Sequence, residues 1–167
     1  MASSAVTIEL RDPANLVNHR AIWYWTVRAL LFWIVVLAIE VIVWLANPDA
    51  RTPIGVVGVV IVLVALVHLA VMPRWRYRVH RWEANDIAVY TRSGWFDQQR
   101  RIAPLSRIQT VDTERGPLEQ LFRLANVTVT TASAAGPLKI NGLALDEADR
   151  LVAELTRITA ESPGDAT

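Results

Sequence analysis

The sequence predicts a membrane-anchored α+β protein with an N-terminal two-helix transmembrane hairpin. An antiparallel β-barrel or sandwich follows the hairpin and is capped by a C-terminal α-helix. Three observations support this fold class. Two long apolar stretches occupy residues 21–46 and 54–72. Short segments of alternating polarity follow them up to residue 140, and residues 146–159 show the period of an amphipathic helix.

The N-terminal residues 1–20 are short and polar. Within them, Asp12-Pro13 resembles a helix start, since Asp is a favoured capping residue and Pro is favoured in the first turn. We therefore expect a disordered tail that leads into an interfacial helix lying on the membrane.

Residues 21–46 form the first predicted span, whose apolar run is interrupted only by Arg28 and Glu40. Its length fits a tilted transmembrane helix. Trp23, Tyr24 and Trp25 are expected to form an aromatic belt at one membrane interface. The alternative is a cleaved signal peptide, but the apolar stretch is too long and no small-x-small cleavage site follows it.

Residues 54–72 form the second predicted span and contain a single polar side chain, His68. At about 1.5 Å per residue the stretch is close to the ~30 Å thickness of the hydrocarbon core, and it is apolar on every face. The seven-residue loop 47–53 holds two prolines and can join only antiparallel neighbours. The two spans therefore form a helical hairpin over residues 21–72, with both chain ends on one side.

The distribution of arginine predicts the orientation. The loop 47–53 holds Arg51 against Asp49, whereas the opposite flanks of the hairpin are strongly basic. By the positive-inside rule both termini lie in the cytoplasm, which predicts a multi-pass membrane protein with a cytoplasmic domain. The basic flanking residues are Arg11, Arg20, Arg74, Arg76, Arg78 and Arg81.

Residues 73–161 are predicted to form a cytoplasmic domain, followed by a disordered tail at 162–167. From residue 74 to 81 Arg and apolar residues alternate, which predicts a strand leaving the membrane. Ser93-Gly94 is expected to make a hairpin turn. The other expected elements are strands at 87–91, 95–102, 106–113, 126–131 and 138–140, a helical turn at 118–124 and the helix at 146–159.

The segment Pro104-Leu105-Ser106-Arg107-Ile108-Gln109-Thr110-Val111 resembles the signature of the bacterial PH-like domain of the YdbS/YdbT type (bPH_2). Other pieces agree in order: Tyr77-Arg78 after a two-helix hairpin, Gly116-Pro117-Leu118, Phe122-Arg123-Leu124 and Gly142-Leu143. The resemblance covers about residues 20–160. It implies a PH-like fold of two antiparallel sheets closed by the C-terminal helix, and a related membrane protein with several such domains as partner.

Glu40, Gly55 and Gly58 are candidate intramembrane contact residues. An ionisable side chain within a span is costly and often functional, and small residues permit close helix packing. Glu40 lies about 9 Å from the end of its span and His68 about 21 Å from the same side, which argues against a direct pair. Three interpretations stay open for Glu40: a protonated or hydrated group, a contact between subunits, or a role in transport or catalysis. The glycines pack against the first span or against another protein.

Basic residues of the domain are candidates for binding anionic lipids or a protein partner. The alternative is that they serve only membrane topology or lie on solvated strand faces. The acidic first hairpin at 83–86 argues against phosphoinositide specificity. The candidate lipid- or partner-binding residues are Arg74, Arg76, Arg78, Arg81, Arg100, Arg101 and Arg107.

Signals for an enzyme are absent from the sequence. It has no Cys, three scattered His, and no nucleotide, phosphate-loop or zinc motif, so we expect no catalytic residues, cofactor or metal. The net charge of +1 does not favour nucleic acid. Three functions follow, in decreasing order of support: a membrane-anchored interaction module at the cytoplasmic face, a non-specific sensor of anionic lipids, and an accessory subunit of a transporter or membrane enzyme centred on Glu40.

Overall fold

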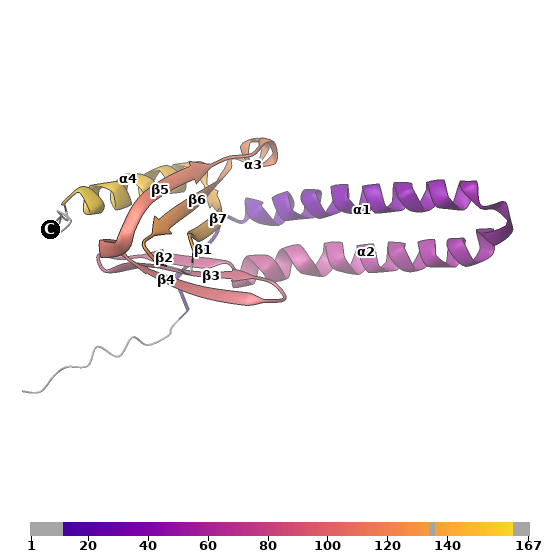
Figure 1. Cartoon of the computed structure of the whole chain (residues 1–167), viewed down its shortest axis with the longest axis horizontal. Coiled ribbons are helices and arrows are strands. Elements are labelled where there is room, and N and C mark those ends of the chain that lie inside the picture. Colours follow the sequence, from indigo (N-terminus) through magenta and orange to yellow (C-terminus); the bar gives the residue numbers. More distant parts are fainter. Residues whose placement is uncertain (1–11, 134–135, 162–167) are drawn as a thin grey trace, which may run out of the picture.

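A computed structural model describes residues 12–133 and 136–161. Helices α1 (Arg20–Ala46) and α2 (Arg51–Val79) lie antiparallel as a long hairpin, joined by the short turn η1 (Pro48–Ala50) (Figure 1). Both helices are long and apolar enough to cross a membrane. All the strands lie at the end of the hairpin where α1 begins and α2 ends (Figure 1). The predicted hairpin followed by a β domain is therefore confirmed.

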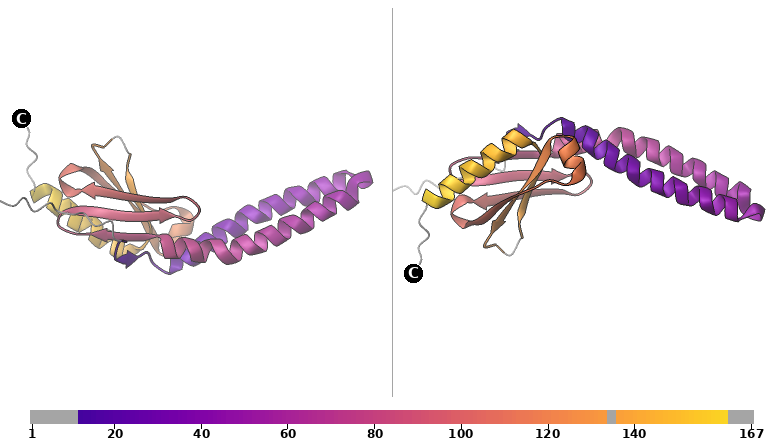
Figure 2. Two further views of the ribbon diagram at one scale, coloured as in Figure 1. Left: turned by 90° about the horizontal axis from the view of Figure 1, so that it is seen from below. Right: turned by 90° about the horizontal axis from the view of Figure 1, so that it is seen from above.

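The β domain consists of two antiparallel sheets whose strands cross one another (Figure 2). The first sheet has the order β1-β2-β3-β4, and the second has the order β5-β6-β7. The strands are β1 (Asn15–Leu16), β2 (Arg81–Ala84), β3 (Ala88–Gly94), β4 (Gln98–Pro104), β5 (Ile108–Glu114), β6 (Leu124–Thr131) and β7 (Leu138–Ala144). Short helices η2 (Leu105–Arg107) and α3 (Pro117–Leu121) connect them, and α4 (Leu145–Glu161) covers the assembly.

The core lies between the two sheets and α4. Val89 of the first sheet, Val127 of the second and Leu155 of α4 are almost completely buried in it. Ala148 and Leu151 of α4 are buried as well, as its amphipathic stripe predicts. The predicted α+β fold with a capping C-terminal helix is confirmed.

The first turns of α1 belong to the β domain rather than to the membrane. Tyr24 and Trp25 are part of the hydrophobic core, and Trp25 is 1% exposed whereas its neighbour Trp23 is 64% exposed. The backbone N–H of Asn18 donates to the carbonyl of Gly142 (2.9 Å) and brings β7 close to this helix. The predicted interfacial belt is therefore wrong for Tyr24 and Trp25, because a protein core accepts the same aromatic side chains as a membrane interface does.

Two further expectations are corrected. The interfacial helix is wrong for the described residues 12–19, because Asn15–Leu16 pair with β2; residues 1–11 and the tail 162–167 lie outside the described residues. The strand expected at 74–81 is wrong up to Val79, because α2 continues through Pro73. Burial there follows Met72, Arg76 and Val79, the spacing of one helix face, while the alternation of arginine with apolar residues is incidental.

The turn between β3 and β4 lies further along the chain than expected. Gly94 pairs with Gln98 at the end of the ladder, which leaves residues 95–97 as the loop. Gly94 has φ +109°, and a Cβ there would lie 1.8 Å from the carbonyl oxygen of Asp97. Trp95 and Phe96 are therefore in a loop, not in the strand predicted for residues 95–102.

Candidate functional site

The structure brings the three predicted intramembrane residues together. Glu40 of α1 lies against Gly58 of α2, where an added Cβ would be 3.3 Å from the Glu40 Oε1 atom. Gly55 lies one turn away and faces the Trp44 indole, whose Nε1 would be 3.8 Å from an added Cβ. The glycines therefore pack against the first span, which was one of the two expected uses.

A groove between the two helices passes over this contact, and we refer to it as the Glu40 groove. It has a volume of about 380 Å³, and its walls are almost entirely apolar. The Oε1 atom of Glu40 is buried and has no hydrogen-bond partner among the described residues. The lining residues are Leu37, Glu40, Val41, Gly55, Gly58, Val59, Val62 and Leu63.

His68 lies apart from this groove. Its Nδ1 accepts a hydrogen bond from the Trp33 Nε1 atom (2.9 Å), so its polar contact within the hairpin is to an indole of α1. This agrees with the expectation that Glu40 and His68 do not pair. The carboxyl group of Glu40 is left with an apolar surrounding, in which an unpaired polar oxygen is costly.

At the base of the hairpin a second carboxyl group, that of Glu119, accepts hydrogen bonds from within the chain. The hydroxyl of Tyr24 donates to Glu119 Oε1 (2.7 Å), and Asn126 Nδ2 donates to the same oxygen (3.4 Å). Burial alone would raise the pKa of Glu119, but hydrogen bonds from Tyr24, from its own backbone and from Asn126, with the charge of Arg28, lower it below the ordinary value. This contact fixes α3 to α1, and no sequence motif indicated it.

His80 directly follows α2 and is buried against α1. Its Nδ1 atom donates to the Arg76 carbonyl (2.8 Å), and its ring lies 4.9 Å from that of Trp25. The Arg76 guanidinium lies over the same indole, 4.6 Å from its centre. Burial first, and the charge of Arg76 second, lower the pKa of His80 to about 4, although the bond to the backbone opposes this. His80 is therefore neutral at physiological pH.

The seven candidate arginines do not form one surface. Arg74, Arg78 and Arg107 are exposed, but Arg107 lies in η2, far along the chain from the helix end that carries the other two. Arg100 pairs with Asp12 (2.9 Å), and the neighbouring Arg101, on the opposite face of β4, donates to the carbonyl of Pro137 (2.9 Å). Arg76 covers Trp25 as described, and Arg81 donates to the Pro13 carbonyl (3.4 Å).

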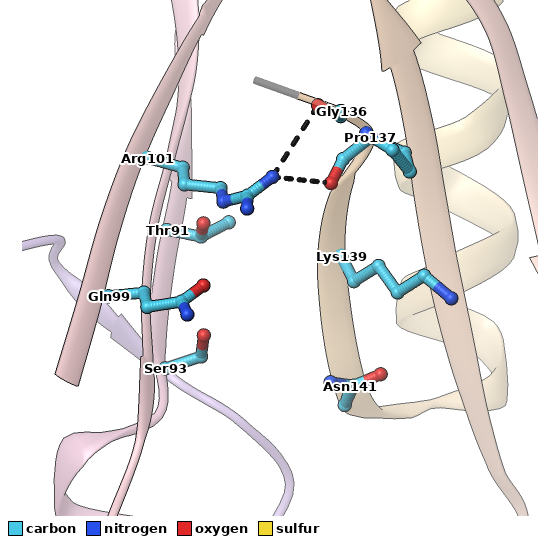
Figure 3. A pocket seen from close by; sticks show the side chains of 8 residues that line it. All are labelled: Thr91, Ser93, Gln99, Arg101, Gly136, Pro137, Lys139 and Asn141. Atoms are coloured by element: carbon cyan, nitrogen blue, oxygen red, sulfur yellow. Dashed lines mark hydrogen bonds between the residues drawn. The ribbon is translucent and has the colours of Figure 1, made fainter. Parts of the chain in front are cut away.

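Arg101 belongs instead to a polar cleft between the inner face of β3 and β4 and the strand β7 (Figure 3). The cleft has a volume of about 350 Å³, and the side chains of Gln99 and Arg101 point into it. Sequence reasoning missed it. The one available signal was the pair Lys139 and Asn141, two polar residues with the spacing of one strand face. The lining residues are Thr91, Ser93, Gln99, Arg101, Gly136, Pro137, Lys139 and Asn141.

Within the described ranges, no group of three His, Cys, Asp or Glu side chains has an arrangement that could hold a metal ion. Glu40 has only apolar residues and glycines around it in its groove. The groove therefore combines an apolar surface with one carboxyl group.

Comparison with known proteins identifies the family. Residues 21–159 match the family model described as the bacterial PH domain. The chain belongs to this family. It is 31% identical over 154 residues to the UPF0699 transmembrane protein YdbS of Bacillus subtilis (strain 168), a match that covers 89% of this chain and 96% of YdbS. The match begins in α1, in agreement with the burial of its first turns in the β domain.

A second relative is longer. The UPF0699 transmembrane protein YdbT of Bacillus subtilis (strain 168) is 24% identical over 99 residues, which is 58% of this chain but 20% of YdbT. No solved structure matches the chain. The chain is thus a transmembrane protein with a bacterial PH domain, similar over nearly its whole length to one curated relative and to a fifth of another.

Proposed function

We propose that the protein is a non-enzymatic interaction module, held at the cytoplasmic face of the bacterial cell membrane, which assembles with a longer membrane protein of its own family. The observation that carries this proposal is the Glu40 groove. Glu40 lines this apolar depression between the two spans, and its Oε1 atom, which is buried against Gly58, has no hydrogen-bond partner among the described residues.

A helix of a partner protein is the occupant that fits this groove. Gly55 and Gly58 line the groove and let α1 and α2 lie close together along it, which leaves a shallow apolar surface on which a third helix can pack. A Ser, Thr, Asn, Gln or Trp side chain on that helix would donate to Glu40, a contact worth about 0.6–2 kcal/mol in membranes. Lipid chains fill an apolar groove equally well but donate no hydrogen bond to the carboxyl group.

The kind of partner is supported by the comparisons. Bacillus subtilis (strain 168) has both a protein similar to this chain over 89% of its length and a longer transmembrane protein, YdbT, of which one fifth matches. A short and a long member of one family within one cell fit an assembly of this module with a related protein that carries several such domains.

The test is purification of the tagged full-length chain from its own host in a mild detergent, followed by mass spectrometry of the bound proteins. The expected result is one longer family member in stoichiometric amount. Glu40→Leu and Gly58→Leu are expected to reduce its recovery at least tenfold. Ile42→Leu, at an exposed position turned away from Glu40 on α1, should leave recovery unchanged.

A chain that is recovered alone from its host, at normal expression and with intact fold, would contradict the proposal. If both groove variants recover the partner as well as the unaltered chain does, the Glu40 groove is not the binding site of the partner. The test needs the full-length chain. A truncated β domain that begins at residue 77 would lack Tyr24 and Trp25, which belong to its core.

A second function, binding of anionic lipid, is supported by Arg74 and Arg78. Both are exposed in the last turns of α2, just beyond the apolar stretch, where each basic residue contributes about 1 kcal/mol toward an anionic surface. If it holds, the purified chain retains anionic lipid, and an Arg74→Gln/Arg78→Gln variant loses most of it. Unchanged retention by that variant, measured by lipid mass spectrometry, would count against this function.

A further inference from the structure

We infer that the loop between β3 and β4, residues 95–97, inserts into the lipid bilayer beside α2 and gives the β domain a second attachment to the membrane. The loop extends from the domain toward the helical hairpin (Figure 1). Trp95 and Phe96 are the residues that enter the bilayer, which is the same bilayer that the hairpin crosses. This inference does not depend on the proposed protein partner.

The depth of the loop follows from its contact with α2. The Trp95 ring lies 5.7 Å from the ring of His68, and His68 bonds to Trp33 of α1 within the paired helices. Exposed apolar side chains continue along α2 as far as Val71, about 4.5 Å further toward the β domain. Trp95 therefore reaches the level of the last lipid-facing turn of the helix.

The loop is held at this level by its backbone. The Nε1 atom of Trp75 on α2 donates to the carbonyl oxygen of Trp95 (2.9 Å). The two ends of the loop are fixed by the pairing of Gly94 with Gln98. The position of Trp95 is thus set by its contacts to His68 and Trp75 of α2 and by the end of the β3–β4 ladder.

Phe96 is the most exposed apolar side chain of the loop. It is 90% exposed, and its ring contact is to Trp95, 6.2 Å away. Transferring a Phe side chain from water to an apolar environment is favourable, because apolar surface is removed from water. On α2, Trp75, which bonds to Trp95, and Val71, one turn before it, are also exposed, so that the apolar surface of the loop adjoins the apolar surface of the helix through Trp95.

The composition of the loop favours lipid over a protein occupant. Aromatic residues, Trp above all, are enriched at the level of lipid headgroups, where an apolar ring and a polar group are both satisfied. Asp97 and Gln98 follow Phe96 directly and are exposed, which limits insertion to the outer few ångströms of the leaflet. With the hairpin as the first attachment and this loop as the second, the tilt of the β domain on the membrane is fixed.

The experiment uses the absence of cysteine from the chain. A Phe96→Cys variant of the full-length protein is labelled with bimane and reconstituted into phosphatidylcholine vesicles. Quenching is measured with a nitroxide on the lipid acyl chain and, separately, with aqueous iodide. The matched control is Ile87→Cys, since Ile87 is 74% exposed but lies in the turn at the other end of β3.

The expected result is at least threefold stronger quenching by the lipid nitroxide at position 96 than at position 87, and the reverse order with iodide. Iodide access at position 96 equal to that at position 87 would overturn the inference. Protection of position 96 from both quenchers would also overturn it, because it would show that a protein covers the loop. An Asp97→Cys probe with intermediate values for both quenchers would support shallow insertion, and its full burial in lipid would contradict it.

Discussion

The two parts of α1, residues 20–29 and 30–46, belong to one continuous helix but differ in what surrounds them. Ala21, Tyr24 and Trp25 on one face of the first turns pack into the core of the β domain, whereas the large apolar residues from Leu30 to Leu45 are mostly exposed on the membrane-spanning part. The carboxyl groups beside the two parts differ in the same way. Glu119 accepts hydrogen bonds from Tyr24 and Asn126, while Glu40 Oε1 has no such bond among the described residues.

This difference indicates two roles for polar groups near the hairpin. The contact at the base is satisfied within the chain and therefore serves the fold. The carboxyl group in the span is not satisfied within the described chain, and in hydrocarbon such a group requires a donor or a proton. Substitutions at the base should therefore change stability, and substitutions at Glu40 should change assembly.

The largest expected loss of stability comes from a substitution at the base of the hairpin. Trp25→Ala removes a buried indole from the core, and we expect a loss of about 3–5 kcal/mol in the free energy of unfolding. Trp23→Ala, two residues earlier and exposed, should cost less than about 1 kcal/mol. Near-ultraviolet circular dichroism during unfolding in detergent measures both. Equal losses for the two variants would show that the first turns of α1 are not part of the core.

The second effect is a pH dependence that originates at the base. Because the pKa of His80 is lowered to about 4, the unfolded chain binds a proton below about pH 6.5 that the folded chain does not. Stability is therefore complete above pH 6.5 and falls by about 3 kcal/mol as the pH decreases to 4. Thermal unfolding in detergent across this window measures the decrease.

His80→Gln should flatten this dependence, whereas His19→Gln, at an exposed position before α1, should leave it unchanged. A slope that survives the removal of His80 would assign the titration to another group.

The smallest effect sharpens the comparison of the two carboxyl groups. Tyr24→Phe removes the hydroxyl that donates to Glu119, and we expect a loss of about 1–2 kcal/mol in unfolding free energy. Glu40→Gln in the purified protein should change it by less than about 0.5 kcal/mol, because the chain supplies no bond to Glu40 Oε1 that would be lost. A larger loss at Glu40 than at Tyr24 would reverse the assignment of the two roles.

The sequence predicted the parts of the molecule that the membrane constrains most strongly. Two long apolar stretches and a short proline-containing loop leave few alternatives to a hairpin, and Glu40 with Gly58 stood out because ionisable and small residues are informative within a span. The stripe of α4 likewise followed from its period. These features depend on local sequence.

The features that sequence missed depend on contacts between distant segments. Trp25 was assigned to an interface because membrane interfaces and protein cores accept the same side chain. The alternation at 74–79 suggested a strand, although α2 continues there. The contact of Trp95 with His68 and the cleft at Arg101 arise from the placement of β3 and β4 beside α2 and β7, which no local pattern specifies.

The most direct test of the central claim is site-specific photocross-linking in native membranes. A benzophenone is attached to a single cysteine introduced by Val41→Cys, which lines the Glu40 groove, or by Ile42→Cys, at a 64% exposed position outside the groove, about 100° further around α1. We predict cross-linking of the Val41 probe to one longer family member, at least fivefold above the Ile42 probe. Equal cross-linking from both positions, or reaction with lipid alone at both, would contradict the proposal that this groove receives a partner helix.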